Sequence, residues 1–291
     1  MIPHHLAITA IAKELEKQRD LLAKAKKQQD EPAVVKQFQD KIQALNGQRE
    51  RLNQERISLQ IVIEDDTTAF RQMFVDIADN ALGITSSVRI RFDARKVVNR
   101  AVEPMLKHSL LHGRVDLEQD RITASNPNLL GARHVADLIR SVAVGIDGRV
   151  GKRLEDELRE DALVDDTNRY LDTLLEAFPQ LVALADGELT PEELRKTSLL
   201  GASTILRVLA GVYHELRKQK LDDDQISDFY SQLNPYLNVP LTADSVWVTE
   251  LGDVFTEGAT APRSRRQDLR QLTDTITGWA IDTPAWLTKG A

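Results

Sequence analysis

The chain has 291 residues, of which 42% are hydrophobic, so it is long enough to bury a core in one large domain or two medium ones. Its net charge of −7 excludes a protein that coats nucleic acid over its whole surface, because phosphate contacts need concentrated Lys and Arg. No apolar run approaches the roughly 18 residues of a membrane span, the best candidate at 205–212 being interrupted by Arg207. Cysteine is absent, which excludes disulfides and thiolate sites. We expect a cytoplasmic protein without a membrane partner, in which any DNA site is local.

The N-terminal residues predict two long amphipathic helices. Apolar residues repeat at seven-residue intervals over 6–29 and again over 33–56, and Asp30-Glu31-Pro32 separates the two segments. Narrow apolar seams and a short connection favour an antiparallel helical hairpin with coiled-coil packing over 1–58. Its basic residues alternate with acidic ones, which is typical of a solvated face, and the segment 8–59 is also a candidate for homo-oligomer formation.

A central region with short strands is predicted for 59–145. The β-branched run 59–63 is typical of a buried strand, and a helix is expected between Thr67 and Gly83. From Val88 to Phe92 apolar residues alternate with Arg89 and Arg91, so we expect an extended segment with both arginines on one exposed face.

Two further helices are predicted in this region. Asp93 is expected to open the first, which runs to Leu111 and is kinked or ended by Pro104. The second spans 132–144 and is followed by 145–151, a segment with three glycines that we take as a domain boundary.

The remainder, 146–291, predicts a helical domain. Apolar residues recur at helical spacing, Thr190-Pro191-Glu192-Glu193 carries a helix-start signal, and a last helix is expected over 266–281. Acidic runs at 155–166, 186–193 and 222–228 indicate solvated helix faces. The sequence therefore predicts an α+β, predominantly α-helical protein.

The strongest local electrostatic signal is a first basic cluster over 89–100, with five cations and one carboxylate in twelve residues. Guanidinium groups bind phosphate in a bidentate manner, and an amide contacts a phosphate or a base edge. The alternative is a salt-bridge network with the acidic C-terminal residues. The predicted nucleic-acid-binding residues of this cluster are Arg89, Arg91, Arg95, Lys96, Asn99 and Arg100.

A second basic cluster lies where a loop enters the 266–281 helix. Several arginines near a helix start oppose the helix dipole, which favours an external anion such as the phosphate backbone, although solvent exposure alone would tolerate them. Its predicted DNA-contacting residues are Arg263, Arg265, Arg266 and Arg270.

Other kinds of site find little support. His108 and His112 have the spacing of a helical metal pair but lack a third ligand nearby, so no metal is predicted. The glycines of 145–151 lack the Lys-Ser/Thr ending of a phosphate loop, and no serine stands in a nucleophile elbow. We expect no cofactor and no enzymatic activity.

Four segments carry a resemblance to proteins of the DGQHR-domain and DndB-like family, which is associated with DNA phosphorothioation: Ile61-Val62-Ile63, Gln72-Met73-Phe74-Val75-Asp76-Ile77, Asp93-Ala94-Arg95-Lys96-Val97-Val98-Asn99-Arg100 and Gly113-Arg114-Val115-Asp116. The resemblance spans roughly 59–145. Ala78 stands where family members often carry Asn, and the Asp-Gly-Gln-His-Arg motif itself is missing, with Ile2–Ile8 in its place. We therefore expect the C-terminal portion of such a protein, whether a split partner, a truncation or a product of a different start codon.

The resemblance implies a function in DNA modification. It implies a double-stranded DNA-binding protein, acting as a transcriptional regulator of a phosphorothioation or phage-defence locus. One alternative is a protein-interaction or dimerisation module that partners a DGQHR-containing half without DNA binding of its own. Another is a fragment of a nucleotide-dependent enzyme.

Overall fold

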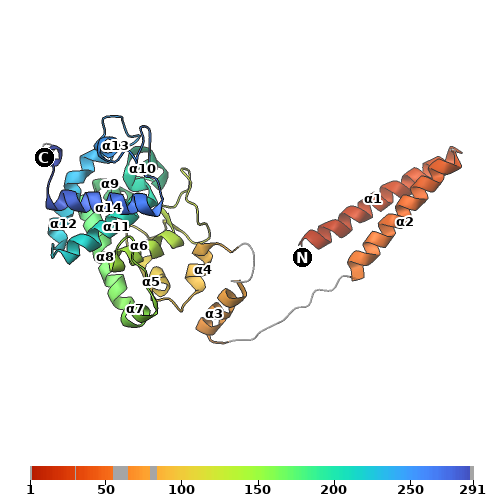
Figure 1. The fold of residues 1–291 in the computed structure, drawn as a ribbon. Coiled ribbons are helices and arrows are strands. Elements are labelled where there is room, and N and C mark those ends of the chain that lie inside the picture. The colour runs from red at the N-terminus through yellow and green to blue at the C-terminus, as the bar shows by residue number, and fades with distance from the viewer. Residues whose placement is uncertain (1, 30, 55–64, 79–83, 289–291) are drawn as a thin grey trace. The chain divides into compact units, whose positions relative to one another are not determined.

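A computed structural model describes residues 2–29, 31–54, 65–78 and 84–288, which fall into two compact units, Met1–Ile63 and Glu64–Ala291 (Figure 1). The described residues are mostly helical and include one pair of short parallel strands, so the predicted fold class is confirmed. The strand predicted over 59–63 lies outside the described residues. Within the described ranges, no helix has both the length and the apolar character that a membrane crossing requires.

The first unit is the predicted helical hairpin. Helix α1 (Ile2–Lys27) packs against α2 (Pro32–Gln54). On α1 the side chains of Leu15, Gln18 and Ala25 are buried, and Gln18 Nε2 donates a hydrogen bond of 2.7 Å to Glu14. No described residue of α2 is buried, so the apolar seam of α2 stays partly open to solvent.

The second unit holds the other helices and both strands. The strands pair in parallel, with Val115 opposite Leu130. In chain order the elements are α3 (Thr67–Ala78), α4 (Ser86–Phe92), α5 (Val97–Met105), β1 (Val115–Asp116), β2 (Leu130–Gly131), α6 (Ala132–Val144), α7 (Lys152–Glu157), α8 (Glu160–Ala177), α9 (Pro179–Asp186), α10 (Pro191–Thr197), η1 (Leu199–Gly201), α11 (Ser203–Lys218), α12 (Asp223–Leu233), η2 (Asn234–Tyr236), α13 (Val246–Glu250), α14 (Arg266–Ile281) and α15 (Ala285–Thr288).

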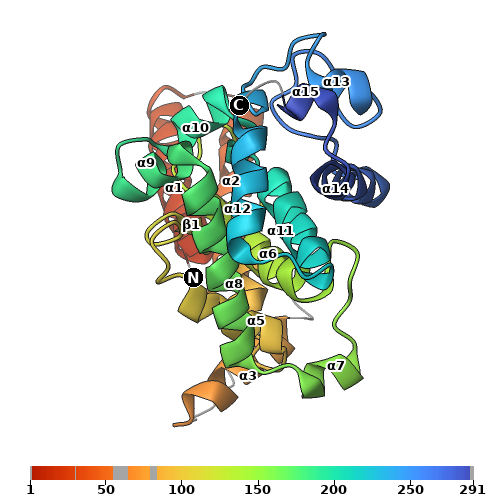
Figure 2. The same ribbon diagram turned by 90° about the vertical axis from the view of Figure 1, so that its left-hand side faces the viewer.

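Helix α11 lies at the centre of the second unit. It packs against α6 and α14, and α8 packs against α12 (Figure 2). Two buried tyrosines tie these helices together, since Tyr170 of α8 donates to the Leu206 carbonyl at 2.6 Å and Tyr230 of α12 donates to the Leu209 carbonyl at 2.7 Å. Burial raises the pKa of both phenols, so they remain neutral donors.

Three helices begin or end where local sequence signals predicted. The spans predicted for α6 and α14 are confirmed. At the start of α10 the Thr190 hydroxyl accepts from Glu193 N–H at 3.2 Å, and the Glu193 carboxylate accepts from Thr190 N–H at 2.9 Å. This reciprocal cap satisfies two helix-end donors within one turn.

The prediction of an extended segment over 88–92 was wrong, because these residues belong to the helix α4. Residues 89 and 91 are therefore about 200° apart around a helix axis and do not share a face. The helix after it also begins later than expected. Asp93 ends α4, the residue is only 4% exposed, and α5 starts at Val97.

The predicted boundary at 145–151 lies within continuous packing. Buried side chains of α5 and α6 before it belong to the same core cluster as those of α8, α11 and α14 after it. The division into 1–58, 59–145 and 146–291 remains a prediction.

Candidate nucleic-acid interface

Helix α4 is held at its N-terminus by a distant carboxylate. Asp120 accepts hydrogen bonds from the backbone N–H groups of Ser86 at 2.8 Å and Ser87 at 2.7 Å, and Thr85 caps the helix locally by accepting from Val88 N–H. Burial by itself raises the pKa of Asp120, but the hydrogen bonds from Ser86 and Ser87 outweigh it and hold the pKa below its usual value. The loop before β2 therefore fixes the place of α4 and of the arginines that it carries.

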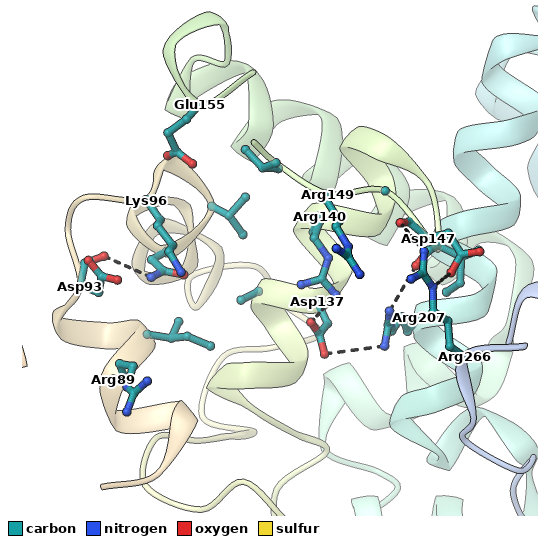
Figure 3. A pocket seen from close by; sticks show the side chains of 17 residues that line it. Arg89, Asp93, Lys96, Asp137, Arg140, Asp147, Arg149, Glu155, Arg207 and Arg266 are labelled. Atoms are coloured by element: carbon teal, nitrogen blue, oxygen red, sulfur yellow. Dashed lines mark hydrogen bonds and ion pairs between the residues drawn. The ribbon is translucent and has the colours of Figure 1, made fainter. Parts of the chain in front are cut away.

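Beside α4 lies a cavity of about 470 Å³, called here the cationic cavity. Residues from α4, α5, α6, α11 and α14 meet there, together with the 146–150 segment and α7 (Figure 3). Figure 3 shows Arg89 and Lys96 on one side and Arg149, Arg207 and Arg266 on the other. The cavity is lined by Arg89, Ile90, Asp93, Lys96, Val98, Asn99, Ala136, Asp137, Arg140, Ile146, Asp147, Gly148, Arg149, Val150, Glu155, Arg207 and Arg266.

Two glycines let the 146–150 segment form a wall of this cavity. A Cβ atom on Gly148 would lie 2.0 Å from the carbonyl oxygen of Val144, a distance that no side chain can occupy without backbone movement. A Cβ atom on Gly211 would lie 3.0 Å from Ile146 Cβ, so α11 approaches the segment closely. These two contacts place Arg149 at the cavity.

The charged side chains that α6 and α11 contribute to the cavity partly neutralise one another. Arg140 donates to Asp137 at 2.6 Å, and Arg207 lies 4.0 Å from the other oxygen of the same carboxylate. Arg207 also donates to the Ile146 carbonyl at 3.2 Å. Burial lowers the pKa of Arg207, and Asp137 opposes that effect, so the guanidinium stays charged at neutral pH.

Two more carboxylates of the cavity, Asp147 and Glu155, have partners within the protein. Asp147 accepts from Arg266 Nε at 2.7 Å and lies 3.8 Å from Arg270 Nε. Glu155 accepts a short hydrogen bond from the backbone N–H of Val97, the first residue of α5. A carboxylate is favourable at that helix end because it meets both an unpaired donor and the positive end of the helix dipole.

Two cations of the cavity, Lys96 and Arg149, differ from those that are paired with a carboxylate. Within the ranges that the structure describes, neither Lys96 nor Arg149 forms an ion pair, and both side chains are exposed. They can turn toward an external anion without breaking an internal contact. Such a cation binds phosphate at a lower free-energy cost than one already paired with a carboxylate.

The first basic cluster is divided between two cavities. Arg89, Lys96 and Asn99 line the cationic cavity, whereas Arg91 and Arg100 line a second cavity of about 450 Å³, and Asn99 lines both. Arg91 lies over the Phe92 ring at 5.7 Å.

Arg95, Asn99 and Arg100 of this cluster have polar contacts within the chain. Arg100 pairs with Glu160 at 3.2 Å, which is the kind of contact that the salt-bridge alternative describes. Arg95 pairs with Asp93 at 2.9 Å and with Asp76 at 3.3 Å. Asn99 Nδ2 donates to the Asp93 carbonyl at 3.2 Å.

Of the second basic cluster, Arg266 alone lines the cationic cavity. Arg270 lies behind it, near Asp147 and near Asp274 at 3.7 Å. Arg263 donates to the Asp253 carbonyl at 2.9 Å, and the exposed Arg265 precedes the first turn of α14. Two predicted clusters more than 160 positions apart in the sequence thus meet in one cavity.

Sequence reasoning missed three cations of the cavity: Arg140, Arg149 and Arg207. Arg207 had a usable signal, because an arginine that interrupts an apolar run on a helix is positioned to be buried with a partner. Arg149 had a weaker signal, because the glycines around it permit the 146–150 segment to pack closely against its neighbours. Nothing in the local sequence distinguishes Arg140 from a surface arginine with an i,i+3 partner.

Of the two histidines considered as metal ligands, His108 has a contact within the protein. His108 Nε2 lies 3.0 Å from Asp172, and the side chain of His108 is 7% exposed. In the described part of the chain, no group of three or more His, Asp or Glu side chains is arranged to hold a metal ion.

Comparison with known proteins connects this geometry to a family. The model of the DndB family, described as DNA-sulfur modification-associated, matches residues 38–238, which is more than half of the chain. Neither the curated proteins nor the solved structures gave a match. The matched region begins in α2 and includes most of the cationic cavity, with Arg266 beyond its end. The chain belongs to the DndB family of DNA-sulfur modification-associated proteins.

Proposed function

We propose that this protein binds double-stranded DNA through the rim of the cationic cavity and regulates transcription of a locus for DNA sulfur modification or phage defence. We define the rim as Arg89, Lys96, Arg149 and Arg266, and the observation that carries the proposal is that these four cations line one cavity although they come from distant parts of the chain. Family membership supports the link to DNA sulfur modification. The role is one of binding without catalysis.

The rim would act by neutralising phosphates. Arg89, Lys96 and Arg149 are exposed and belong to separate elements, so they can follow successive phosphates of a backbone. The acidic runs elsewhere on the chain repel DNA, and this repulsion restricts binding to the basic rim. Contacts by Arg91, Arg95, Arg100, Arg263, Arg265 and Arg270 remain predictions.

The test is duplex binding by fluorescence anisotropy at two salt concentrations, with promoter DNA from the protein's own locus and a scrambled duplex of equal length. A regulator binds the promoter more tightly, and its affinity falls with salt. Salt-sensitive binding without preference would support phosphate contact but contradict a regulator. No binding at low salt would contradict both.

Substitution of the rim sharpens the test. The triple variant Arg89→Ala, Lys96→Ala, Arg149→Ala should weaken binding to all duplexes and reduce the slope of log affinity against log salt by about three. The matched control removes three cations outside the cationic cavity: Arg153→Ala, Lys196→Ala, Lys218→Ala. Equal losses in both variants would show that only net charge matters and would reject the rim.

A second candidate function is protein interaction through the hairpin. The observation that favours it is the partly open apolar seam of α2, on which no described residue is buried. A second copy of the hairpin, or a partner carrying the DGQHR half, would cover that seam. This candidate does not require DNA binding.

A further inference from the structure

The shape of the cationic cavity sets it apart from a surface that only follows a duplex. A duplex backbone is convex and meets the rim, but it leaves the interior empty. Clefts and cavities of about 300–1,000 Å³ are typical of sites for small molecules, and this one measures about 470 Å³. Its interior is therefore of a size that admits one nucleotide.

The charge of the interior favours an anion. Six cations line the cavity, namely Arg89, Lys96, Arg140, Arg149, Arg207 and Arg266, against four carboxylates, namely Asp93, Asp137, Asp147 and Glu155. Three of these carboxylates also have a partner that is not a cation of the cavity: Asp93 pairs with Arg95, Asp147 lies 3.8 Å from Arg270, and Glu155 accepts from a backbone N–H. Six cations against four carboxylates leave the lining with a formal excess of two positive charges, which matches the two negative charges of a terminal phosphate group.

The uncharged lining indicates what the anion is attached to. Ile90, Val98, Ile146 and Val150 give the cavity an apolar wall beside its cations. Inorganic phosphate would leave this wall without a partner. A base and sugar would pack against it, while the amide of Asn99 lies within the same cavity as a group that can read a base edge.

From these observations we infer that the cationic cavity is a binding site for a nucleoside 5′-phosphate, either a free nucleotide or the phosphorylated end of a DNA strand. Lys96 and Arg149 hold the phosphate, and the apolar wall holds the nucleoside. The site does not depend on duplex binding by the rim, since it is filled by a single nucleotide.

The test is calorimetric titration of the full chain, without duplex DNA and in phosphate-free buffer, with deoxyadenosine 5′-monophosphate, deoxyadenosine and inorganic phosphate. The nucleotide should bind at least about tenfold more tightly than either of its parts, which is the effect expected for one charge-assisted contact. Equal affinity of the nucleotide and deoxyadenosine, or of the nucleotide and inorganic phosphate, would overturn the inference.

Substitutions place the site. Arg149→Ala should weaken nucleotide binding about tenfold, and Arg153→Ala, which removes a 91% exposed cation outside the cavity, should leave it unchanged. Lys96→Ala provides a second variant, because Lys96 contributes only its backbone to the start of α5. If Arg149→Ala and Arg153→Ala weaken binding equally, or if both cavity variants fold and bind like the wild type, the cavity is not the site.

Competition assigns the source of the phosphate. A short single strand with a 5′-phosphate should displace the bound nucleotide if the cavity takes strand ends, and the same strand with a 5′-hydroxyl should not. If neither form of the strand displaces the bound nucleotide, the site binds free nucleotides. Displacement by both forms alike would contradict recognition of a terminal phosphate.

Discussion

Asp147 controls how much positive charge the rim offers. It lies between Arg266, at 2.7 Å, and Arg270, at 3.8 Å, and its side chain is only 27% exposed. A carboxylate shared by two guanidinium groups fixes their positions and cancels one of their charges. The pair at the entry to α14 therefore acts toward DNA as roughly one cation.

Replacing Asp147 with Asn should increase DNA affinity. The variant keeps the size of the side chain and frees one net positive charge, so the affinity for duplex DNA should rise about threefold at low salt and the salt slope should steepen by about one. Anisotropy titrations at two salt concentrations measure both effects. The control is Asp166→Asn, which removes a carboxylate paired with Arg169 outside the cationic cavity. An equal gain in the control would mean that Asp147 has no special place in binding.

At the scale of elements, α4 depends on contacts from outside itself. A seven-residue helix is too short to be stable alone, because nucleation costs more than so few hydrogen bonds return. Thr85 caps α4 locally, and Asp120 satisfies two further N–H groups from the loop before β2. Arg89 therefore reaches the cationic cavity only while this loop is in place.

Asp120→Ala should destabilise the protein in a pH-dependent way. Loss of the cap should lower the free energy of unfolding by about 1–2 kcal/mol at neutral pH. Since folding lowers the pKa of Asp120 below 3.8, its contribution is fully present above pH 3.8 and is lost as the pH falls through the folded-state value. Urea unfolding of both proteins over this range measures the difference, which should shrink in acid. A difference that stays constant below that pKa would contradict the role of the ionised carboxylate.

The contrast between α4 and α10 shows what sequence can predict at this scale. The start of α10 is encoded by Thr190 and Glu193 within one turn, so reading the chain locally was sufficient. In α4 the apolar residues alternate with a period of two, which favours a strand, and besides the local cap Thr85 the helix is held by Asp120, more than thirty positions away. Tertiary contacts overrode the local pattern there.

At the scale of the whole molecule, the partly exposed apolar seam of α2 predicts a partner that covers it. Among the described side chains of the two helices only Leu15, Gln18 and Ala25 are buried, which leaves apolar surface in water, whereas two hairpins together would form a four-helix bundle with a closed core. A second copy of the chain supplies the required hairpin without another gene product. We therefore expect a dimer.

The dimer can be tested by light scattering of the full chain. The wild type should have twice the mass of the 32.7 kDa chain, and the double variant Phe38→Glu, Leu52→Glu should have the mass of one chain, because buried carboxylates oppose packing. The control Gln39→Glu, Gln43→Glu adds the same charge at exposed positions of α2 and should remain dimeric. A wild-type mass of one chain would reject self-association.

The candidate site was predictable only in pieces. Both basic clusters are visible as local excesses of charge, but their meeting point is not, because it depends on how α4 and α5 pack against α6 while α6 and α14 pack against α11. The same packing selects Arg89, Lys96 and Arg266 for the cationic cavity and directs Arg91 and Arg100 to another. The charge of each cluster can be read from its own segment of sequence, whereas the meeting of the two clusters depends on the tertiary structure.

The close approach at Gly148 and Gly211 has a consequence for recognising related sites. An arginine can move to a neighbouring position and still bind a phosphate, because its side chain is long and flexible. A sequence pattern built on arginines alone would therefore have low specificity. The two glycines are harder to exchange, since a Cβ atom on Gly148 would lie 2.0 Å from the Val144 carbonyl oxygen and one on Gly211 would lie 3.0 Å from Ile146 Cβ. A sequence pattern that requires glycine at the positions of Gly148 and Gly211, and a basic residue at the position of Arg149, would identify proteins that can form this wall. Without the wall there is no cavity for a phosphate to enter.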